Sequence, residues 1–567
     1  MRWRPPGEWP RGSRSTPTGA RRPGAGLAAL GGACLAIALL AWAPDDSRAA
    51  ARFTIDTEPV WQVADDRPIA QPEIRRWNQI RAYVDAQWLR PMDRLLAIHR
   101  TSPARDLNAW DAVPASSWFT PGRAGKPPWM APARTIPAPG AQQEPPRPDH
   151  SGPLAVSEAC LQGPASHLIV RDARGARYWI VFDEPEAPDR RTAAAVISSR
   201  LLDAAGYPVL PTVIDALARE ELILDADARR VGEFGGRRGL TPEALDRFFA
   251  RLLSADPEAG RVQSTRLRIA AGRLPESTIL GGFSPSGVRP DDPNDRIPHE
   301  DRRSLRGLRI LACWLDLAGI RQDRTLDLYL YSERYVRHHL GGLGLTLGNH
   351  SRGQEDLPSR LLYPLDGFGT RGLDPITWSP AEPYLPFDEM QWGDALWGVR
   401  LLLAFTDAEI AAAVAAGRYG DRSMEAYIAG SLQERRDRIG QGWLAQVNSI
   451  GGFAVTAAPG GRWSLTAADL GVRHGLRQAE DVAYLLSMRL PATGETLGYQ
   501  SRSADPLTFD LSPFTPAAWL HRQDPRRYAV AELRCWDHTG RALTGATRVH
   551  LYFDRDSGPR IVGIVRD

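Results

Sequence analysis

Residues 314–348, WLDLAGIRQDRTLDLYLYSERYVRHHLGGLGLTLG, contain the pattern that decides the fold. The stretch begins with the end of an apolar helix, and TLDLYL and VRHHL follow as two strand-like segments around a polar turn. The glycines after Leu340 then predict a sharp corner, because glycine adopts the backbone angles that tight turns require. A helix end, a short loop and a hairpin that runs into a glycine corner therefore form the expected centre of the protein.

The residues around this centre predict a mostly helical region over 233–448. A long helix is expected from Pro298, with one apolar face made by Leu305, Leu308, Leu311, Ala312 and Leu315. Further helices are expected at 241–253, 395–405 and 424–444, and Thr406 with Glu409 forms a capping box that predicts another helix start.

Upstream, residues 154–232 predict a small β-rich region. HLIVRD and YWIVFD flank a turn at 173–176 and so predict a hairpin. A helix is expected at 191–205, closed by Gly206, and TVIDALAREELIL supplies further strands. Residues 51–153 predict one amphipathic helix near 73–99, which would act as a brace, followed by a proline-rich connector that cannot be a helix or a central strand.

After Asn448 the pattern is β again. Six short strand-like segments, separated by Gly, Pro and Asp turns, predict a β-sandwich over 449–567. The expected fold class is therefore α+β. A small β-rich lobe and a mostly helical lobe precede the C-terminal sandwich.

The first fifty residues resemble a targeting segment. A head rich in arginine precedes an apolar run at 27–43, with small-residue sites at its end. The run is short and diluted by Ala and Gly, which favours a cleaved signal peptide over an uncleaved anchor. We therefore expect export across the bacterial inner membrane to the periplasm or beyond, with membrane contact only through this segment if it is retained.

Length and composition limit the functions further. The chain has 567 residues, too many for one core, with 43% hydrophobic and 24% charged residues. Its 70 basic and 67 acidic residues are interspersed, which gives no basic groove for nucleic acid. Lys126 is the single lysine, so no strand lysine is present to grip a phosphate. Past residue 50, Cys160, Cys313 and Cys535 lie far apart, which excludes a zinc knuckle and a disulfide framework.

Several sequence blocks resemble a known family. DAVPASSWFT, HLIVRDARGARYWIVFDEP, GYPVLP, VRPDDPNDRIPHEDRRSLRGLRILACWL, TLDLYL and VRHHLGGLGLTLG occur in the order of an uncharacterised family of exported bacterial proteins. That family is similar to an atypical, HipA-like or lipid-kinase-like kinase core, and the resemblance covers about residues 111–444. It implies a two-lobed kinase-like fold.

The resemblance also implies that the phosphoryl-transfer residues have been replaced. A kinase needs a strand lysine, a helix glutamate, a catalytic acid and metal-binding Asp and Asn residues. The family pattern places these at Val181, Ala195, Gly319, Arg324 and Gly342. The chain is thus expected to be a pseudokinase-like member that needs no cofactor.

Two other groups are candidate sites. Arg321 and Arg324 could bind an anion without metal, or they could be solvated or pair with Asp323 and Asp327. Asp291, Asp292, Asp295 and His299 could hold Ca²⁺ or Mg²⁺, whereas helix-entry hydrogen bonds explain the same residues without a metal. His338 and His339 are neighbours on a strand, so they point to opposite faces and cannot chelate together.

The expected function is a non-catalytic binding or structural component of the cell envelope, with an envelope protein or a glycan as partner. The alternative is a divergent nucleotide- or phosphate-dependent transferase that uses the same cleft without the usual metal ligands.

Overall fold

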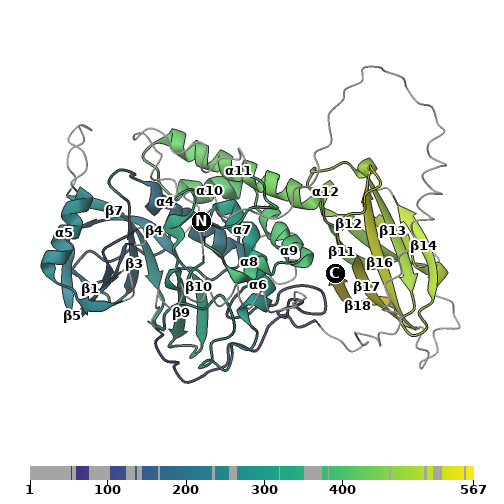
Figure 1. The fold of residues 1–567 in the computed structure, drawn as a ribbon, viewed down its shortest axis with the longest axis horizontal. Coiled ribbons are helices and arrows are strands. Elements are labelled where there is room, and N and C mark those ends of the chain that lie inside the picture. Colours follow the sequence, from purple (N-terminus) through teal and green to yellow (C-terminus); the bar gives the residue numbers. More distant parts are fainter. Residues whose placement is uncertain are drawn as a thin grey trace, which may run out of the picture. The chain divides into compact units, whose positions relative to one another are not determined.

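The computed structural model describes residues 53, 59–75, 102–122, 134–136, 144–163, 166–232, 236–253, 265–317, 320–349, 373–380, 382–458, 462–502, 507–514, 527–554 and 557–566. The expected signal segment, Lys126 and residues 76–99 of the expected brace helix lie outside these ranges. The described residues form a mixed α/β protein with four sheets and several helices (Figure 1). No helix among them is long and apolar enough to cross a membrane.

The largest sheet has seven strands in the order β4-β7-β3-β2-β1-β5-β6. Its strands are β1 (Leu154–Cys160), β2 (His167–Arg171), β3 (Arg177–Phe182), β4 (Thr212–Ala218), β5 (Leu222–Val231), β6 (Arg237–Gly239) and β7 (Arg266–Leu274). The expected hairpin is confirmed, since β2 and β3 pair antiparallel around Gly175, which has a φ of 83°. The sheet is larger than the sequence indicates, and β7 brings a strand from beyond the expected boundary at residue 232.

One helix covers each face of this sheet. On β3, Tyr178, Ile180 and Phe182 pack in one core with residues of α5 (Pro242–Leu253). The alternate residue Val181 lies on the other face, in a cluster with Ala195 of α4 (Arg190–Ala205). Successive side chains of a strand point to opposite faces, so β3 is apolar along its length because both faces are covered. Gly206 ends α4 at a φ of 105°, as expected.

The prediction of one long helix from Pro298 is wrong. That segment forms three short elements, η4 (His299–Asp301), α6 (Arg303–Arg306) and α7 (Leu308–Leu315). Arg302 has an extended backbone, with φ −92° and ψ 123°, which separates η4 from α6. At Gly307 a Cβ would lie 2.5 Å from the Trp397 ring, so the backbones approach closely there. Tertiary packing therefore breaks a pattern that reads locally as one helix.

The remaining helices of this region largely follow the expectations. They are α8 (Leu385–Asp388), α9 (Trp392–Leu403), α10 (Asp407–Ala415) and α11 (Arg422–Leu444). The capping box is confirmed, since Thr406 accepts from the Glu409 backbone while the Glu409 carboxylate accepts from Thr406.

The central hairpin is confirmed as well. After the turn η5 (Gln322–Arg324), β9 (Thr325–Leu330) pairs antiparallel with β10 (Val336–Leu340), and β8 (Ser277–Ile279) pairs with β9 on its other side. Gly342, with a φ of 67°, then starts the turn η6 (Leu343–Leu345). The Leu340 amide donates to the Pro208 carbonyl at 2.9 Å, which ties the hairpin to the segment between α4 and β4.

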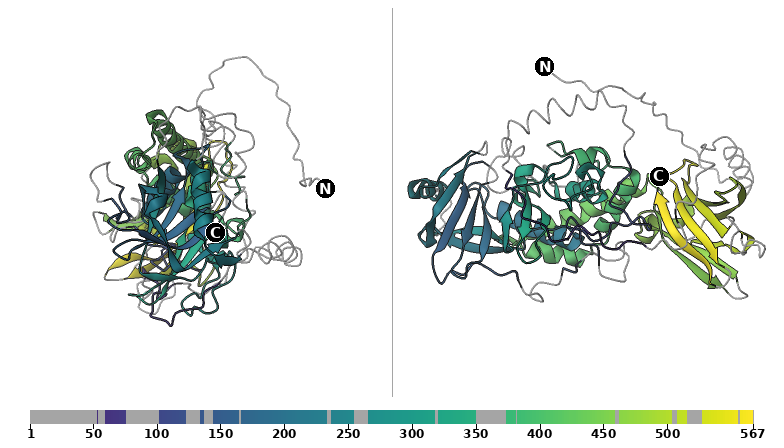
Figure 2. Two further views of the ribbon diagram at one scale, coloured as in Figure 1. Left: turned by 90° about the vertical axis from the view of Figure 1, so that its left-hand side faces the viewer. Right: turned by 90° about the horizontal axis from the view of Figure 1, so that it is seen from below.

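Residues 450–566 contain two further sheets. One has the order β11-β12-β15 and the other β14-β13-β16-β17-β18. Their bounds are β11 (Ile450–Ala458), β12 (Arg462–Asp469), β13 (Val482–Arg489), β14 (Thr496–Arg502), β15 (Leu507–Asp510), β16 (Tyr528–Asp537), β17 (Thr547–Asp554) and β18 (Gly558–Arg566). Figure 2 shows these strands gathered together, and Leu465 and Phe509 of one sheet share a core with Tyr484 and Leu533 of the other. The six expected strands are present, while β14 and β15 were not predicted.

The last strand is joined to the helical region by buried charges. Asp111 accepts hydrogen bonds from Arg303 of α6 and from Arg566 of β18. Burial would raise the pKa of Asp111, but these two guanidinium groups hold it below its usual value. An ion pair that is fully enclosed in this way needs both partners in place.

Candidate functional site

A cavity lies where α4, the seven-stranded sheet and the hairpin β9–β10 meet. Its empty volume is about 810 Å³. It is lined by Ser166, His167, Trp179, Val181, Arg191, Ala195, Leu210, Thr212, Ala270, Gly272, Asp323, Arg324, Leu326, Leu340, Gly341, Gly342, Leu343, Gly344 and Leu345. That volume includes the open solvent at the cavity mouth, and a mostly apolar lining with a few polar groups is typical of small-molecule sites.

Four of the five positions that the family resemblance assigns to phosphoryl-transfer residues meet at this cavity. Val181 comes from β3, Ala195 from α4, Arg324 from η5 and Gly342 from the corner after β10. Gly319 lies outside the described residues. None of the four carries a carboxylate or an amine, so these positions supply neither a metal ligand nor a phosphate-binding lysine.

The two glycines of this corner, Gly342 and Gly344, are closely packed. A Cβ on Gly342 would lie 3.0 Å from the Cβ and 3.2 Å from the Cδ of Arg324, because the arginine stem covers this glycine. A Cβ on Gly344 would similarly lie 3.2 Å from Cγ1 of Val181. Arg324 therefore packs on Gly342, and Val181 packs on Gly344 two residues further along the same corner.

The two arginines of the candidate anion site have acidic neighbours. Arg321 binds both carboxylate oxygens of Asp323, with Nε at 2.7 Å from Oδ1. Arg324 has longer contacts to Glu382, at 3.3 and 3.5 Å. Asp327, named above as a partner of these arginines, is instead buried against Arg289 and His338. The pairing alternative is thus correct for Asp323 and wrong for Asp327.

Arg321 and Arg324 differ in the direction of their pKa shifts and in their position relative to the cavity. The hydrogen bonds to Asp323 raise the pKa of Arg321, whereas burial lowers the pKa of Arg324. The Arg324 side chain is only 11% exposed, and its Nε has no hydrogen-bond partner within the described part of the chain. Arg324 lines the cavity and Arg321 does not. Only Arg324 is placed to meet a molecule inside.

The sequence did not indicate two aromatic residues of this site. His167 on β2 and Trp179 on β3 stack with ring centroids 3.9 Å apart and planes inclined by 19°. Strand alternation was the available signal, because Trp179 and Val181 are two residues apart and share a face of the sheet. This pair forms part of the cavity wall.

Hydrogen bonds fix α4 against the glycine corner. Ser198 and Thr346 share a buried hydrogen bond of 2.6 Å between their hydroxyl groups. At the start of the helix, the Asn349 amide donates to the Arg190 carbonyl and accepts from Arg190 Nε, both at 3.1 Å. The cavity walls are therefore held together by side chains from both elements.

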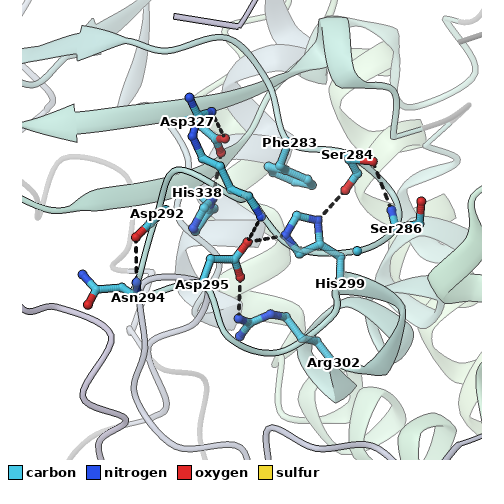
Figure 3. Close-up of polar contacts among 12 residues, drawn as sticks. Phe283, Ser284, Ser286, Asp292, Asn294, Asp295, His299, Arg302, Asp327 and His338 are labelled. Carbon is cyan, nitrogen blue, oxygen red and sulfur yellow. Dashed lines mark hydrogen bonds and ion pairs between the residues drawn. The ribbon is translucent and has the colours of Figure 1, made fainter. Parts of the chain in front are cut away.

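The acidic residues named as a possible metal site bind protein groups instead (Figure 3). Asp295 lies 2.8 Å from His299 Nε2, accepts from Arg302 at 2.9 Å and accepts from the Arg289 backbone at 2.7 Å. Asp292 accepts from the Asn294 backbone at 2.9 Å. Burial would raise the pKa of Asp295, but His299 and Arg302 hold it below the usual range.

Asp291 belongs to a different contact, since it pairs with Arg75 at 2.7 Å and with Arg289 at 3.2 Å. In the part of the chain that the structure describes, no group of three or more His, Cys, Asp or Glu side chains is arranged to hold a metal ion. Ion pairs and hydrogen bonds made by the loop account for these acidic residues, rather than the expected hydrogen bonds at a helix start.

His338 joins the same buried network. Its Nδ1 lies 2.7 Å from Asp327, and its ring stacks on Trp118 at 3.7 Å between centroids. Arg302 lies over the Trp118 ring at 4.8 Å. His339 points elsewhere, with Nδ1 3.1 Å from the Arg337 carbonyl. The network stabilises the hairpin from the side away from the cavity lining, and the contribution of Trp118 was not foreseen.

Cys160, Cys313 and Cys535, the cysteines among the described residues, are free thiols. Cys313 is buried as expected, and burial raises its pKa to about 12. Cys535 donates to Asn448 at 3.2 Å, while Cys160 is partly exposed. None of them lines the cavity.

In comparisons with known proteins, this chain matches solved structures but no family model and no curated sequence. One match is a crystal structure of the Golgi casein kinase, with a TM-score of 0.27 and 10% sequence identity. The match covers 52% of this chain and 74% of the kinase chain. A structure of the Golgi casein kinase with Mn and ADP bound matches with a TM-score of 0.26 and 11% sequence identity. This match covers 52% of this chain and 72% of the kinase chain. The likeness is too weak to assign an activity, and no family membership follows from it.

Proposed function

We propose that this chain is an exported protein with a two-lobed kinase-like core that does not transfer phosphoryl groups and serves as a binding component of the cell envelope. In this proposal the cavity beside α4 is its ligand site, and the C-terminal sheets form a sandwich that contacts an envelope protein or a glycan. It needs neither a nucleotide nor a metal cofactor.

One observation carries the proposal. Val181, Ala195, Arg324 and Gly342 come from four separate elements and meet at one cavity. A standard phosphoryl-transfer site requires a lysine, a glutamate and metal-binding Asp and Asn residues at one such place. Removal of a single electrostatic group commonly costs about 100- to 1,000-fold in rate, and here several are absent together.

Calorimetry and thermal unfolding of the purified mature chain test this proposal. We expect no change with ATP or GTP in the presence of Mg²⁺ or Mn²⁺, and no transfer of labelled phosphate to the chain or to a general protein substrate. Stabilisation that requires both nucleotide and metal would contradict the non-catalytic assignment.

The alternative is a divergent transferase that acts on a phosphate-bearing molecule. It is favoured by one observation, that the basic residue Arg324 is among those that line the cavity. Binding of inorganic phosphate that Arg324→Ala abolishes would favour it. Two further measurements concern export and partner: N-terminal sequencing of the exported chain would locate signal cleavage, and a glycan array probed with the whole mature chain would test glycan contact.

A further inference from the structure

We infer that the cavity beside α4 binds a carboxylic acid with an apolar body, and that Arg324 contacts its carboxylate. This inference rests on the proposed function, because it names the class of ligand for that site. It requires no metal and no covalent step.

The walls of the cavity are apolar and come from three separate clusters. Leu210 and Leu326 belong to one cluster with Trp179 beside it. Ala195 and Ala270 belong to a second with Val181 beside it, and Leu340 and Leu343 belong to the main core. These clusters face the cavity without merging across it. A hydrocarbon or aromatic body would fill this space and remove the apolar walls from water.

The charges around the cavity balance. Arg321 and Arg324 face Asp323 and Glu382, and the buried Arg191 pairs with Glu184. Equal numbers of opposite charges give no excess positive potential to hold a nucleoside triphosphate in the absence of metal. Among the residues that line the cavity itself, the two arginines Arg191 and Arg324 outnumber Asp323 by one, so a ligand with a single negative charge would neutralise the lining.

Arg324 is the residue that would bind the negatively charged carboxylate of the ligand. Its guanidinium has one buried nitrogen, Nε, without a partner in the described residues, and its contacts to Glu382 are as long as 3.3 and 3.5 Å. A planar guanidinium binds a planar carboxylate through two parallel hydrogen bonds. Replacing the long contacts with such a pair would satisfy the orphaned donor, whose burial is otherwise unfavourable.

The chain offers a matched control for this role. Arg321 lies in the same short segment, contacts the same Glu382 and is already paired with Asp323, but it does not line the cavity. A second control fills the site without altering a charge: Ala195 lies in the wall, so Ala195→Phe places a ring in the space that the ligand would occupy.

Isothermal calorimetry with decanoate, decanol and inorganic phosphate tests the inference on the whole mature chain. We expect decanoate to bind, decanol to bind more weakly and phosphate not to bind. Arg324→Met should raise the Kd for decanoate about tenfold or more and leave the Kd for decanol unchanged, since a hydrogen bond to a charged group is commonly worth this much. Arg324→Lys should restore part of the difference, and Arg321→Met should change neither Kd.

Ala195→Phe should abolish binding of both decanoate and decanol. Absence of decanoate binding to the wild type, or equal weakening of decanoate and decanol by Arg324→Met, would overturn the inference. So would equal affinities of the wild type for decanoate and decanol. Those outcomes leave the proposed function standing, whereas metal-dependent nucleotide binding would remove the proposed function itself.

Discussion

Gly342 and Arg324 share one space: a Cβ on Gly342 would lie 3.0 Å from the Cβ of Arg324, and Gly342 has a φ of 67°. The acid that the family resemblance places at 342 therefore cannot be restored by itself. It would need an unfavourable backbone conformation and a displaced arginine. A carboxylate at position 342 would therefore require a change at Arg324 as well.

The first prediction concerns this contact. Gly342→Ala should lower the free energy of unfolding by about 2 kcal/mol, because a left-handed backbone costs a non-glycine residue roughly 1–2 kcal/mol and the new Cβ meets the arginine stem. Urea denaturation measures this. In an Arg324→Ala background the cost should shrink only in part, because the contacts with Cγ and Cδ at 3.2 Å are lost while the 3.0 Å contact with Cβ remains. Gly239→Ala is the control, since that position is open and its φ is not positive, and it should change stability by less than about 0.5 kcal/mol.

The second prediction concerns the buried network. Asp327 and Arg289 have side chains only 1% and 3% exposed, and they pair at 3.0 Å. Asp327→Ala leaves the Arg289 charge enclosed without its closest partner, so it should cost about 3–5 kcal/mol in urea denaturation. Asp291→Ala removes a 26% exposed carboxylate from the same arginine and should cost less than about 1 kcal/mol. Equal costs would contradict the buried-pair account.

The third prediction concerns pH. Burial and the nearby Arg337 charge lower the pKa of His339 to about 3, against about 6.5 in an unfolded chain. Because the folded state favours the neutral ring, this stabilisation is complete above pH 6.5 and is lost as the pH falls toward 3. The slope is at most about 1.4 kcal/mol per pH unit. The free energy of unfolding of His339→Gln, measured by denaturation between pH 4 and 7, should therefore lack the pH-dependent change that comes from His339.

Asp183 changes the pH dependence of stability in the opposite direction to His339 over the same pH interval. Burial raises its pKa to about 6, so its contribution is complete below the unfolded value of about 3.9 and is lost as the pH rises through 6. In the wild type the two groups offset each other between pH 4 and 6. Stability should fall with rising pH in His339→Gln and rise more steeply in Asp183→Asn. Parallel profiles for the wild type and both variants would contradict these assignments.

The fourth prediction concerns metal. The oxygens of Asp295 already meet His299, Arg302 and the Arg289 backbone. Calcium or magnesium chloride, and an excess of EDTA, should therefore each leave the melting temperature unchanged to within about 1 °C, since a metal that binds only the folded state would raise it with concentration. A rise that saturates with Ca²⁺ would show that the acidic loop binds the ion.

Local patterns predicted most of the elements because their causes are local. Thr406 and Glu409 satisfy each other's backbone donors within one turn, and Gly175 closes a hairpin between two apolar runs. The same holds for the hairpin at 325–340, where alternation and the polar turn lie in adjacent residues. The site residues on these elements could be placed on the right strand or helix from the sequence.

Features set by distant residues could not be predicted. The extended backbone at Arg302 interrupts the segment that was expected to be one helix, and the strand β7 joins the sheet only through its pairing with β3 and β4. Asp295 and His299 were candidate metal ligands, with helix-entry hydrogen bonds as the alternative, because they are close in sequence, but Arg302 and Trp118 decide their environment. Sequence spacing identifies charged residues and does not show which of them meet.

The ion pair of Asp111 with Arg566 joins residues that are 455 positions apart. A chain that leaves the ribosome or a translocon from its N-terminus exposes Asp111 long before Arg566 arrives. Until then Arg303 is the partner that this carboxylate can find. The enclosed form of the contact is thus a late step of folding, with the high loop-closure cost that such separations impose. Final closure of the helical region should wait for the last strand, whichever compartment the chain folds in.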